Sequence, residues 1–177
     1  MKNIFLETHR LYLQEFGLDD AEFIIELLNS DGWLKYIGDR NVKTIEEAEA
    51  YLLNGPMKSY EENGFGLAMV QIKDGRIPIG VCGLIKRNYL DHVDIGYALL
   101  PEYWGKGYDY EIADGTVLYA QEHLGIDEIL GVTLKENARS ISVLNKIGLN
   151  FDKHIWVESD NEEVMLFSNK APVGKSY

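Results

Sequence analysis

The stretch PEYWGKGYDYE, residues 101–111, decides how this chain is interpreted, because it places two glycines around a lysine where a helix is predicted to begin. A helix N-terminus exposes unpaired backbone N–H groups and carries the positive end of the helix dipole. Gly105 and Gly107 have no Cβ atom and would let an anion approach those groups. Asp109 would repel the same anion. The function of the chain depends on how this conflict is resolved.

Two nucleotide-binding motifs do not fit this stretch. The dinucleotide fingerprint GxGxxG requires a third glycine at position 110, where the chain has Tyr110. A Walker loop requires GxxxxGK followed by Ser or Thr, and neither glycine stands in that pattern. An ordinary strand-to-helix turn, in which the glycines serve only the backbone geometry, stays open. The surrounding sequence must distinguish this turn from an anion site.

The sequence before residue 101 predicts an antiparallel meander. Three segments, FGLAMVQIK (65–73), IPIGVCGLIK (77–86) and HVDIGYALL (92–100), are rich in strand formers and are separated by turn residues such as Asp74-Gly75. Cys82 lies in the second segment, and as the one cysteine of the chain it predicts core packing rather than a disulfide or a metal cluster.

The N-terminal part predicts a strand followed by helices. Residues 10–16 alternate apolar and polar side chains as a half-buried strand does. Asp19 and Asp20 can cap a helix over residues 21–30, whose apolar positions recur at helical spacing. After a short aromatic segment, GWLKYIG, the pair Thr44 and Glu47 forms a capping-box pattern, which predicts a helix running to about Glu62.

The sequence after residue 106 predicts a β-α-β unit followed by a hairpin. The elements are a helix from about Gly107 to His123, a strand over EILGVTL (128–134), a helix near Ala138 to Ile147, and strands near Phe151 to Val157 and Glu163 to Phe167.

Length and composition limit the class of protein. The 177 residues predict one domain over residues 1–170 with a short flexible tail at 171–177. The start lacks the apolar segment of a secretory signal and no apolar run is long enough to span a membrane, so we expect a cytoplasmic, non-membrane protein. A net charge of −12 argues against a nucleic-acid partner and favours a cationic one, although acidity can also serve solubility alone. The four histidines show no metal-ligand spacing, so we expect no metal.

Three blocks occur in order along the chain: LETHRLYLQEFGLDDAEFI (6–24), VDIGYALLPEYWGKGY (93–108) and ENARSISVLNKIGL (136–149). Together they resemble the GNAT superfamily of N-acetyltransferases, in particular its RimJ/RimL-like branch, which acetylates protein N-termini. The resemblance covers about residues 6–168. It implies a single α/β (α+β) domain with the GNAT acyl-CoA N-acyltransferase fold, in which helices flank a mixed, mostly antiparallel sheet. It also implies that acetyl-CoA is the donor.

The resemblance implies which residues bind coenzyme A. The family's loop has the form Q/R-x-x-G-x-G/A, and its first, fourth and last positions correspond here to Trp104, Gly107 and Asp109. Aspartate departs from the small residue of the family, so we expect weakened but not abolished binding, with the carboxylate pointing away from the ligand and interacting favourably with the helix dipole. The full set implied for the cofactor is Leu99, Leu100, Trp104, Gly105, Lys106, Gly107, Tyr108, Asp109, Tyr110, Asn137 and Ser140.

The resemblance also implies the catalytic groups. Asp94 stands where relatives commonly have a glutamate ahead of IGY, and we expect it to be the general base, although an exposed polar strand residue is an equal alternative. Ser140 is the candidate for interacting with the sulfur or relaying a proton, and Asn137 could equally be an ordinary helix cap. Leu144 stands where many relatives carry a tyrosine acid, which excludes a tyrosine acid at that position.

The acceptor is expected to be a primary amine, either a protein or peptide N-terminus or a small amine. Trp33, Tyr36 and Tyr97 are the candidates for lining its cleft, although aromatic side chains more often pack in cores. A homodimer is compatible with the sequence. The alternative function is a non-catalytic acyl-CoA-binding or regulatory module.

Overall fold

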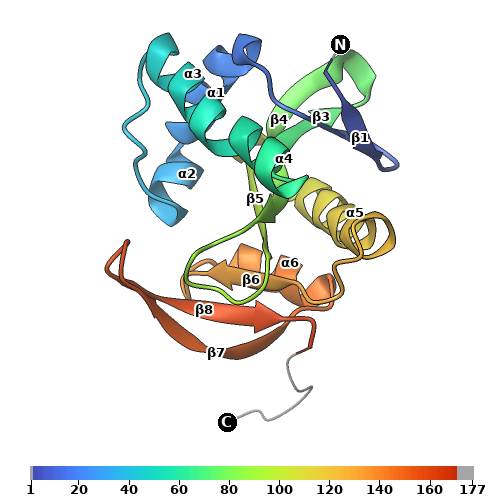
Figure 1. Ribbon diagram of the computed structural model, residues 1–177, viewed down its shortest axis with the longest axis vertical. Helices are drawn as coiled ribbons and strands as arrows, with labels where there is room; N and C mark the ends of the chain where they lie inside the picture. Colours follow the sequence, from blue (N-terminus) through green and yellow to red (C-terminus); the bar gives the residue numbers. More distant parts are fainter. Residues whose placement is uncertain (1, 171–177) are drawn as a thin grey trace.

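The computed structural model describes residues 2–170, so the predicted tail at 171–177 lies outside the described residues. The strands form one open sheet in the order β1-β2-β3-β4-β5-β6-β8-β7 (Figure 1). Every neighbouring pair is antiparallel except β5 and β6, which run parallel. The strands are β1 (Ile4–Glu7), β2 (Leu11–Gln14), β3 (Leu67–Ile72), β4 (Ile77–Ile85), β5 (Asp94–Leu99), β6 (Leu130–Thr133), β7 (Asn150–Val157) and β8 (Glu162–Ser168).

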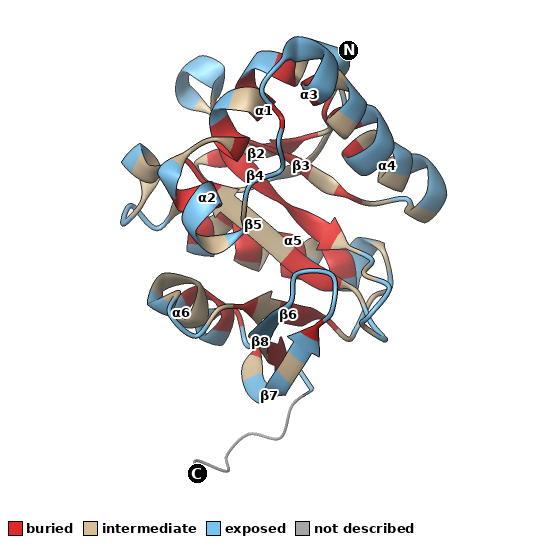
Figure 2. Cartoon of the chain, turned by 90° about the vertical axis from the view of Figure 1, so that its left-hand side faces the viewer, coloured by how far each residue is buried: buried red, intermediate tan, exposed pale blue. Residues whose placement is uncertain are grey.

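Helices cover both faces of the sheet. One face packs its apolar side chains against α5 and α6, and the other packs against α1, α2 and α3. The alternation along β3 produces this division, since Ala68 and Val70 face the first core and Met69 faces the second. In Figure 2 the buried positions concentrate along the strands between these helices. The helices are α1 (Ala21–Leu28), α2 (Asp31–Tyr36), α3 (Ile45–Leu52), α4 (Lys58–Asn63), α5 (Tyr108–His123) and α6 (Ala138–Lys146).

The predicted meander, the β-α-β unit and the C-terminal hairpin are confirmed. The capping box is confirmed as well, because Glu47 N donates to Thr44 Oγ1 at 3.2 Å and Thr44 N donates to Glu47 Oε2 at 3.0 Å. The helix that it starts continues to Asn63 through a wider turn at residues 53–57, where Pro56 has no N–H to donate.

Three local features differ from the predictions. Strand β1 was not predicted, and it pairs with β2. Asp20 does not cap α1, because its carboxylate accepts hydrogen bonds from Gly17 N at 2.9 Å and Lys2 Nζ at 2.6 Å instead. The aromatic segment forms the short helix α2, which is capped by Ser30.

The sheet is interrupted between β5 and β6. Their ladder contains one bridged pair, Asp94 and Leu130, and Leu130 N also donates to Val93 O at 2.9 Å. No other residue pair bridges these two strands within residues 2–170. Each strand then needs other partners for its remaining polar groups, so this is the place in the sheet where a ligand can enter.

The core confirms the role predicted for Cys82. The side chain is fully buried, and burial raises the pKa of its thiol to about 12 even though Thr116 Oγ1 lies 3.4 Å from the sulfur. Such a thiol is an inert packing group. Within residues 2–170, no helix has the length and apolar character needed to cross a membrane.

Candidate active site

A cavity of about 300 Å³ lies where β5 and β6 separate. Side chains from both strands line it, together with residues of α2, α3, β4 and α6 and with Trp104 and Asp109 from the loop before α5 and its first turn. Pockets of this size, with a few polar groups converging on an apolar lining, are the usual form of a small-molecule site.

The glycine-lined loop at the start of α5 is present. Gly105 and Gly107 have φ of +72° and +76°, a region that residues with a Cβ rarely adopt, and Gly107 is the N-cap of α5. No atom lies within 4 Å of where a Cβ of Gly105 would be. The backbone N–H groups of Lys106, Gly107 and Tyr108 donate no hydrogen bond to another residue of the described chain. They are therefore free to bind an anion.

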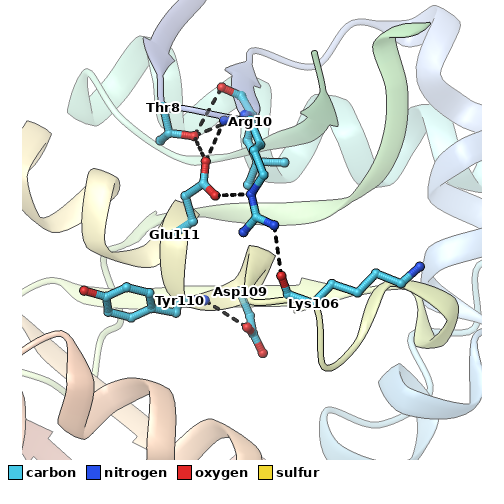
Figure 3. A network of polar contacts seen from close by, with 7 residues as sticks. Thr8, Arg10, Lys106, Asp109, Tyr110 and Glu111 are labelled. Carbon is cyan, nitrogen blue, oxygen red and sulfur yellow. Dashed lines mark hydrogen bonds and ion pairs between the residues drawn. The ribbon is translucent and has the colours of Figure 1, made fainter. Parts of the chain in front are cut away.

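Arg10, at the start of β2, holds this loop in place (Figure 3). Its Nη1 donates to the carbonyl oxygen of Lys106 at 3.0 Å, and its guanidinium lies 4.4 Å from the centre of the Tyr108 ring. Its Nε pairs with Glu111 Oε2 at 2.6 Å. The sequence does not predict this pair, because its two members are 101 positions apart and no local spacing indicates their contact.

Glu111 ties the first turn of α5 to the hairpin of β1 and β2. One carboxylate oxygen, Oε1, accepts from Thr8 Oγ1 and from Arg10 N, both at 2.7 Å. Partial burial favours the neutral form of this carboxyl, but the hydrogen bonds from Thr8 and Arg10 outweigh it and lower the pKa of Glu111. The loop is therefore anchored by a charged group that stays ionised at neutral pH.

The expectation that Asp109 points away from the ligand site is wrong. The residue is buried, lines the cavity and accepts a hydrogen bond from Tyr110 N at 2.9 Å (Figure 3). Its Oδ2 lies 3.8 Å from Arg139 Nε, and the Arg139 guanidinium stacks on the Trp104 ring at 3.6 Å. Arg139 supplies a positive charge that offsets the carboxylate, which explains why an inward orientation is tolerated.

The residues implied for coenzyme A fall into two groups. Leu99, Trp104, Asp109, Asn137 and Ser140 line the cavity. Gly105, Lys106, Gly107 and Tyr108 form the adjoining loop, whereas Leu100 packs in the core beside α1 and Tyr110 lines a separate hollow between β1 and α5. Three features suit a pyrophosphate beside this cavity: the free N–H groups of the loop, the open space next to Gly105, and the positive charge of Arg139.

Asp94 lies at the point where β5 and β6 part. The alternative of an exposed strand residue is wrong, because the side chain is only 1% exposed. Arg87 Nε donates to its Oδ2 at 3.0 Å, while Oδ1 is buried and has no partner in the described chain. Burial raises the pKa of Asp94 to about 6, although Arg87 opposes the shift. A carboxylate with this pKa and a free oxygen is suited to accept a proton near neutral pH.

Two hydroxyl groups meet across the cavity. The Tyr97 hydroxyl lies 3.1 Å from Ser140 Oγ, and it also donates to the Ser140 carbonyl oxygen at 3.1 Å. Burial raises the pKa of Tyr97, so its phenol stays protonated. Asn137 is the N-cap of α6, since its Oδ1 accepts from Ser140 N at 3.1 Å. Leu144 is buried and also lines the cavity.

Four side chains near α2 form a wall of the cavity that we call the α2 wall: Trp33, Tyr36, Arg40 and Tyr51. Trp33 and Tyr36 were predicted from the sequence, whereas Arg40 and Tyr51, on the following loop and on α3, were not. Trp33 is buried, and its Nε1 has no hydrogen-bond partner in the described chain. Residues 2–170 contain no group of three or more His, Cys, Asp or Glu side chains arranged to hold a metal ion.

Comparison with known proteins agrees with this geometry. Residues 10–150 match the family described as the acetyltransferase (GNAT) domain. An uncharacterized N-acetyltransferase of Bacillus subtilis, YoaA, is 30% identical over 145 residues, which cover 81% of each chain. The FsC-acetyl coenzyme A-N(2)-transacetylase of Aspergillus fumigatus is 29% identical over 154 residues, which cover 81% of this chain and 64% of that protein.

The fold is also similar to that of solved structures. The structure of RimL, a ribosomal alpha-N-protein acetyltransferase in complex with coenzyme A, superposes with a TM-score of 0.80 over 94% of this chain and 97% of its own. The two sequences are 13% identical, so this likeness concerns the fold alone.

Proposed function

This chain belongs to the acetyltransferase (GNAT) domain family and is an acetyl-CoA-dependent N-acetyltransferase, and we propose that its acceptor is a primary amine, with a protein or peptide N-terminus first and a small amine second. The observation that carries the proposal is one cavity that reaches from Trp104 and Asp109, beside the glycine-lined loop, to the buried carboxylate of Asp94. The description of RimL as an alpha-N-protein acetyltransferase supports the first kind of acceptor.

The loop before α5 would hold the donor. Acetyl-CoA supplies an acetyl group activated as a thioester. The N–H groups of Lys106, Gly107 and Tyr108 would bind its pyrophosphate, and Arg139 adds positive charge on the same side of the cavity. The negative charge of Asp109 opposes this attraction, so the positive charge of Arg139 would be shared between the Asp109 carboxylate and the ligand.

Asp94 would act as the general base. Its Oδ1 is free to accept a proton from the amine, directly or through one water, while Arg87 holds Oδ2. An α-amine with a pKa of about 7.7–8.0 is partly neutral at pH 7, whereas a lysine amine at about 10.4 needs far more assistance. A base with a pKa of about 6 therefore suits an α-amine better than a lysine.

Tyr97 and Ser140 would supply the proton for the leaving sulfur. The Tyr97 phenol stays protonated and lies next to Ser140 Oγ, and both residues line the cavity. Leu144 lines the same cavity and has no polar group that could donate a proton. Tyr97 therefore serves as a proton donor from β5 in place of a tyrosine on α6. Tyr97→Phe keeps the ring and removes the proton, and we expect it to lower kcat by about tenfold to a hundredfold while acetyl-CoA affinity is unchanged.

The experiment that tests the function is a mixture of protein, acetyl-CoA and a panel of amines, in which the release of free thiol is followed. Turnover with N-terminal peptide amines supports the proposal. Tight binding of acetyl-CoA by calorimetry, without turnover of any amine in the panel, would instead support a module that binds the cofactor without catalysis.

A further inference from the structure

We propose that the preferred acceptor carries a carboxylate close to its primary amine, as free amino acids and acidic peptide N-termini do. The inference rests on the amine acetylation proposed above and names the class of its substrate. Three polar groups of the cavity carry it: the Trp33 indole N–H, the Arg40 guanidinium and the free oxygen of Asp94.

Trp33 holds a buried donor that the chain itself does not satisfy. The residue is 5% exposed, it lines the cavity, and Nε1 has no partner among the described residues. Buried indole N–H groups are almost always hydrogen-bonded, because an unmet donor in a protein interior is costly. Because Trp33 lines the cavity, the group that complements this unpaired N–H is an oxygen acceptor on the ligand.

Arg40 lines the same cavity and is an exposed cation. It forms no ion pair or hydrogen bond within the described chain, although its neighbour Asp39 pairs with Lys43. The Arg40 charge opposes the rise that burial causes in the pKa of Tyr51, so the guanidinium lies near that phenol of the α2 wall. A guanidinium and an unpaired N–H group in the lining of one cavity are both donors that suit the oxygens of a carboxylate.

Asp94 offers the opposite chemistry deeper in the cavity. Its Oδ1 is a buried acceptor without a partner, and a primary amine is the complementary donor. The cavity thus presents a place for an amine at Asp94 and a place for an anion at the α2 wall. A polyamine would satisfy the first and be repelled at the second.

The charge of the cavity differs from that of the whole chain. Its charged lining consists of three arginines and two aspartates, which gives it one more positive than negative group, whereas the chain has a net charge of −12. Asp94 and Asp109 are each paired with an arginine, so Arg40 is the lining cation left without a partner in the described chain. The overall acidity of the protein therefore does not predict a cationic acceptor.

The test compares acceptors that differ in one charge. Phenylalanine is compared with phenylalaninamide, with rates expressed per neutral amine, and the peptide amide Ala-Asp-Phe-Ala is compared with Ala-Asn-Phe-Ala. Spermidine is the cationic acceptor. In at least one pair, we expect the kcat/KM of the anionic acceptor to be about tenfold higher than that of its neutral partner. A preference in the first pair identifies a free amino acid as the acceptor, and a preference in the second pair identifies an acidic peptide. Calorimetry with the protein saturated by coenzyme A measures the same preference without turnover.

Variants connect the preference to the α2 wall. Arg40→Gln should remove the advantage of the anionic acceptor, mainly by raising the KM of that acceptor, whereas Arg40→Lys should retain part of the advantage. Lys146→Gln is the control, since Lys146 is an exposed cation in the last turn of α6 and does not line the cavity. Trp33→Phe keeps the ring, removes the N–H group, and should also lower the preference.

The outcomes separate this inference from the function on which it rests. Turnover that is equal for the charged and neutral members of both pairs, or that is fastest with spermidine, overturns the anionic acceptor and leaves amine acetylation intact. A preference that survives in Arg40→Gln and Trp33→Phe also overturns the assignment to the α2 wall. Cofactor binding without turnover of any amine removes both proposals.

Discussion

The loop at residues 104–111 and the α2 wall line the same cavity but are satisfied to different degrees. In the loop the two carboxylates are already engaged, since Arg10 pairs with Glu111 and also donates to the Lys106 carbonyl oxygen, and Asp109 faces Arg139. In the α2 wall, the Trp33 N–H and the Arg40 guanidinium have no partner within residues 2–170. The carboxylates of the donor side are therefore paired within the chain, whereas the polar groups of the acceptor side are left for the ligand.

The loop and the α2 wall should therefore control different properties of the enzyme. A rigid, internally bonded loop can bind a cofactor without reorganisation, so changes there should alter cofactor affinity. Open polar groups discriminate between ligands because a wrong ligand leaves them unpaired, so changes in the α2 wall should alter which amine is used. Asp94 lies where the two regions meet, and a change there should affect the chemical step rather than the affinity for acetyl-CoA.

The largest effect is expected for Asp94→Asn. Removing the base should lower kcat by about 10²–10³-fold and leave acetyl-CoA affinity unchanged. Since burial raises the pKa of Asp94 to about 6 and the base works in its ionised form, wild-type kcat/KM should rise with pH through about 6. This rise of kcat/KM with pH should be absent in the variant. Stopped-flow detection of the released thiol measures both kcat and the pH dependence of kcat/KM. A variant with a wild-type rate and profile would remove Asp94 from the mechanism.

The same substitution has a stability signature with a definite sign. A carboxyl whose pKa is raised in the folded state contributes stability that is present below its usual pKa of 3.8 and is lost as pH rises through about 6. Asp94→Asn should therefore gain stability relative to the wild type between pH 4 and pH 7, by about 2–3 kcal/mol in urea unfolding. If the difference in unfolding free energy between the two proteins does not change with pH, the pKa of Asp94 is not raised in the folded state.

The next prediction compares a glycine at the start of α5 with a glycine just after its end, by their effect on cofactor affinity. Gly107→Ala places a Cβ at a φ of +76° and should reduce acetyl-CoA affinity by about tenfold, because the strained residue shifts the amides that grip the ligand. Gly125→Ala, beyond the other end of α5 at a φ of +66°, is the control. Both should lose about 1 kcal/mol of stability. Equal cofactor affinity in the two variants would contradict the role of the loop.

A smaller effect is expected from the charges that face each other at the loop. Asp109→Ala removes a carboxylate beside the anion site and frees Arg139, so acetyl-CoA should bind about threefold to tenfold more tightly. Arg139→Gln should weaken binding by a similar factor. Calorimetry gives both values, with Asp114→Ala as a control on the same helix. Unchanged or weaker binding by Asp109→Ala would show that this carboxylate does not repel the ligand.

The smallest effect on activity is expected for Glu111→Gln, which loosens the anchor of the loop. At pH 7 the variant should lose about 1–2 kcal/mol of unfolding free energy, with turnover within about twofold. Because the pKa of Glu111 is lowered, its contribution is lost as pH falls below the usual value of 4.5, and the two proteins should converge there. Glu22→Gln, an exposed glutamate in the first turn of α1, should show neither effect.

The parts of the fold that depend on neighbouring residues could be predicted from the sequence. The capping box at Thr44 and the glycine start of α5 both carry local signals, and the structure has both. Strand β1 was missed, because it is short and only half buried, so its periodicity is weak. The cap of α2 by Ser30 was missed for a similar reason, since six residues give too short a pattern.

The arrangement of the site depends on contacts between distant residues, and this part could not be predicted. The inward orientation of Asp109 is set by Arg139, which lies 30 positions further on. Arg40 reaches the cavity from a loop with no periodic pattern, and Tyr97 meets Ser140 only because β5 and α6 flank the same opening. A residue pattern can indicate a charged side chain, but its partner is decided by the tertiary fold.

The most direct test of the account is a crystal structure of the protein with acetyl-CoA. We expect pyrophosphate oxygens within hydrogen-bond distance of the N–H groups of Lys106, Gly107 and Tyr108, and the acetyl end of the thioester between Tyr97 and Asp94. Phosphates seated instead in the hollow between β1 and α5, with the cavity between β5 and β6 left to solvent, would contradict it.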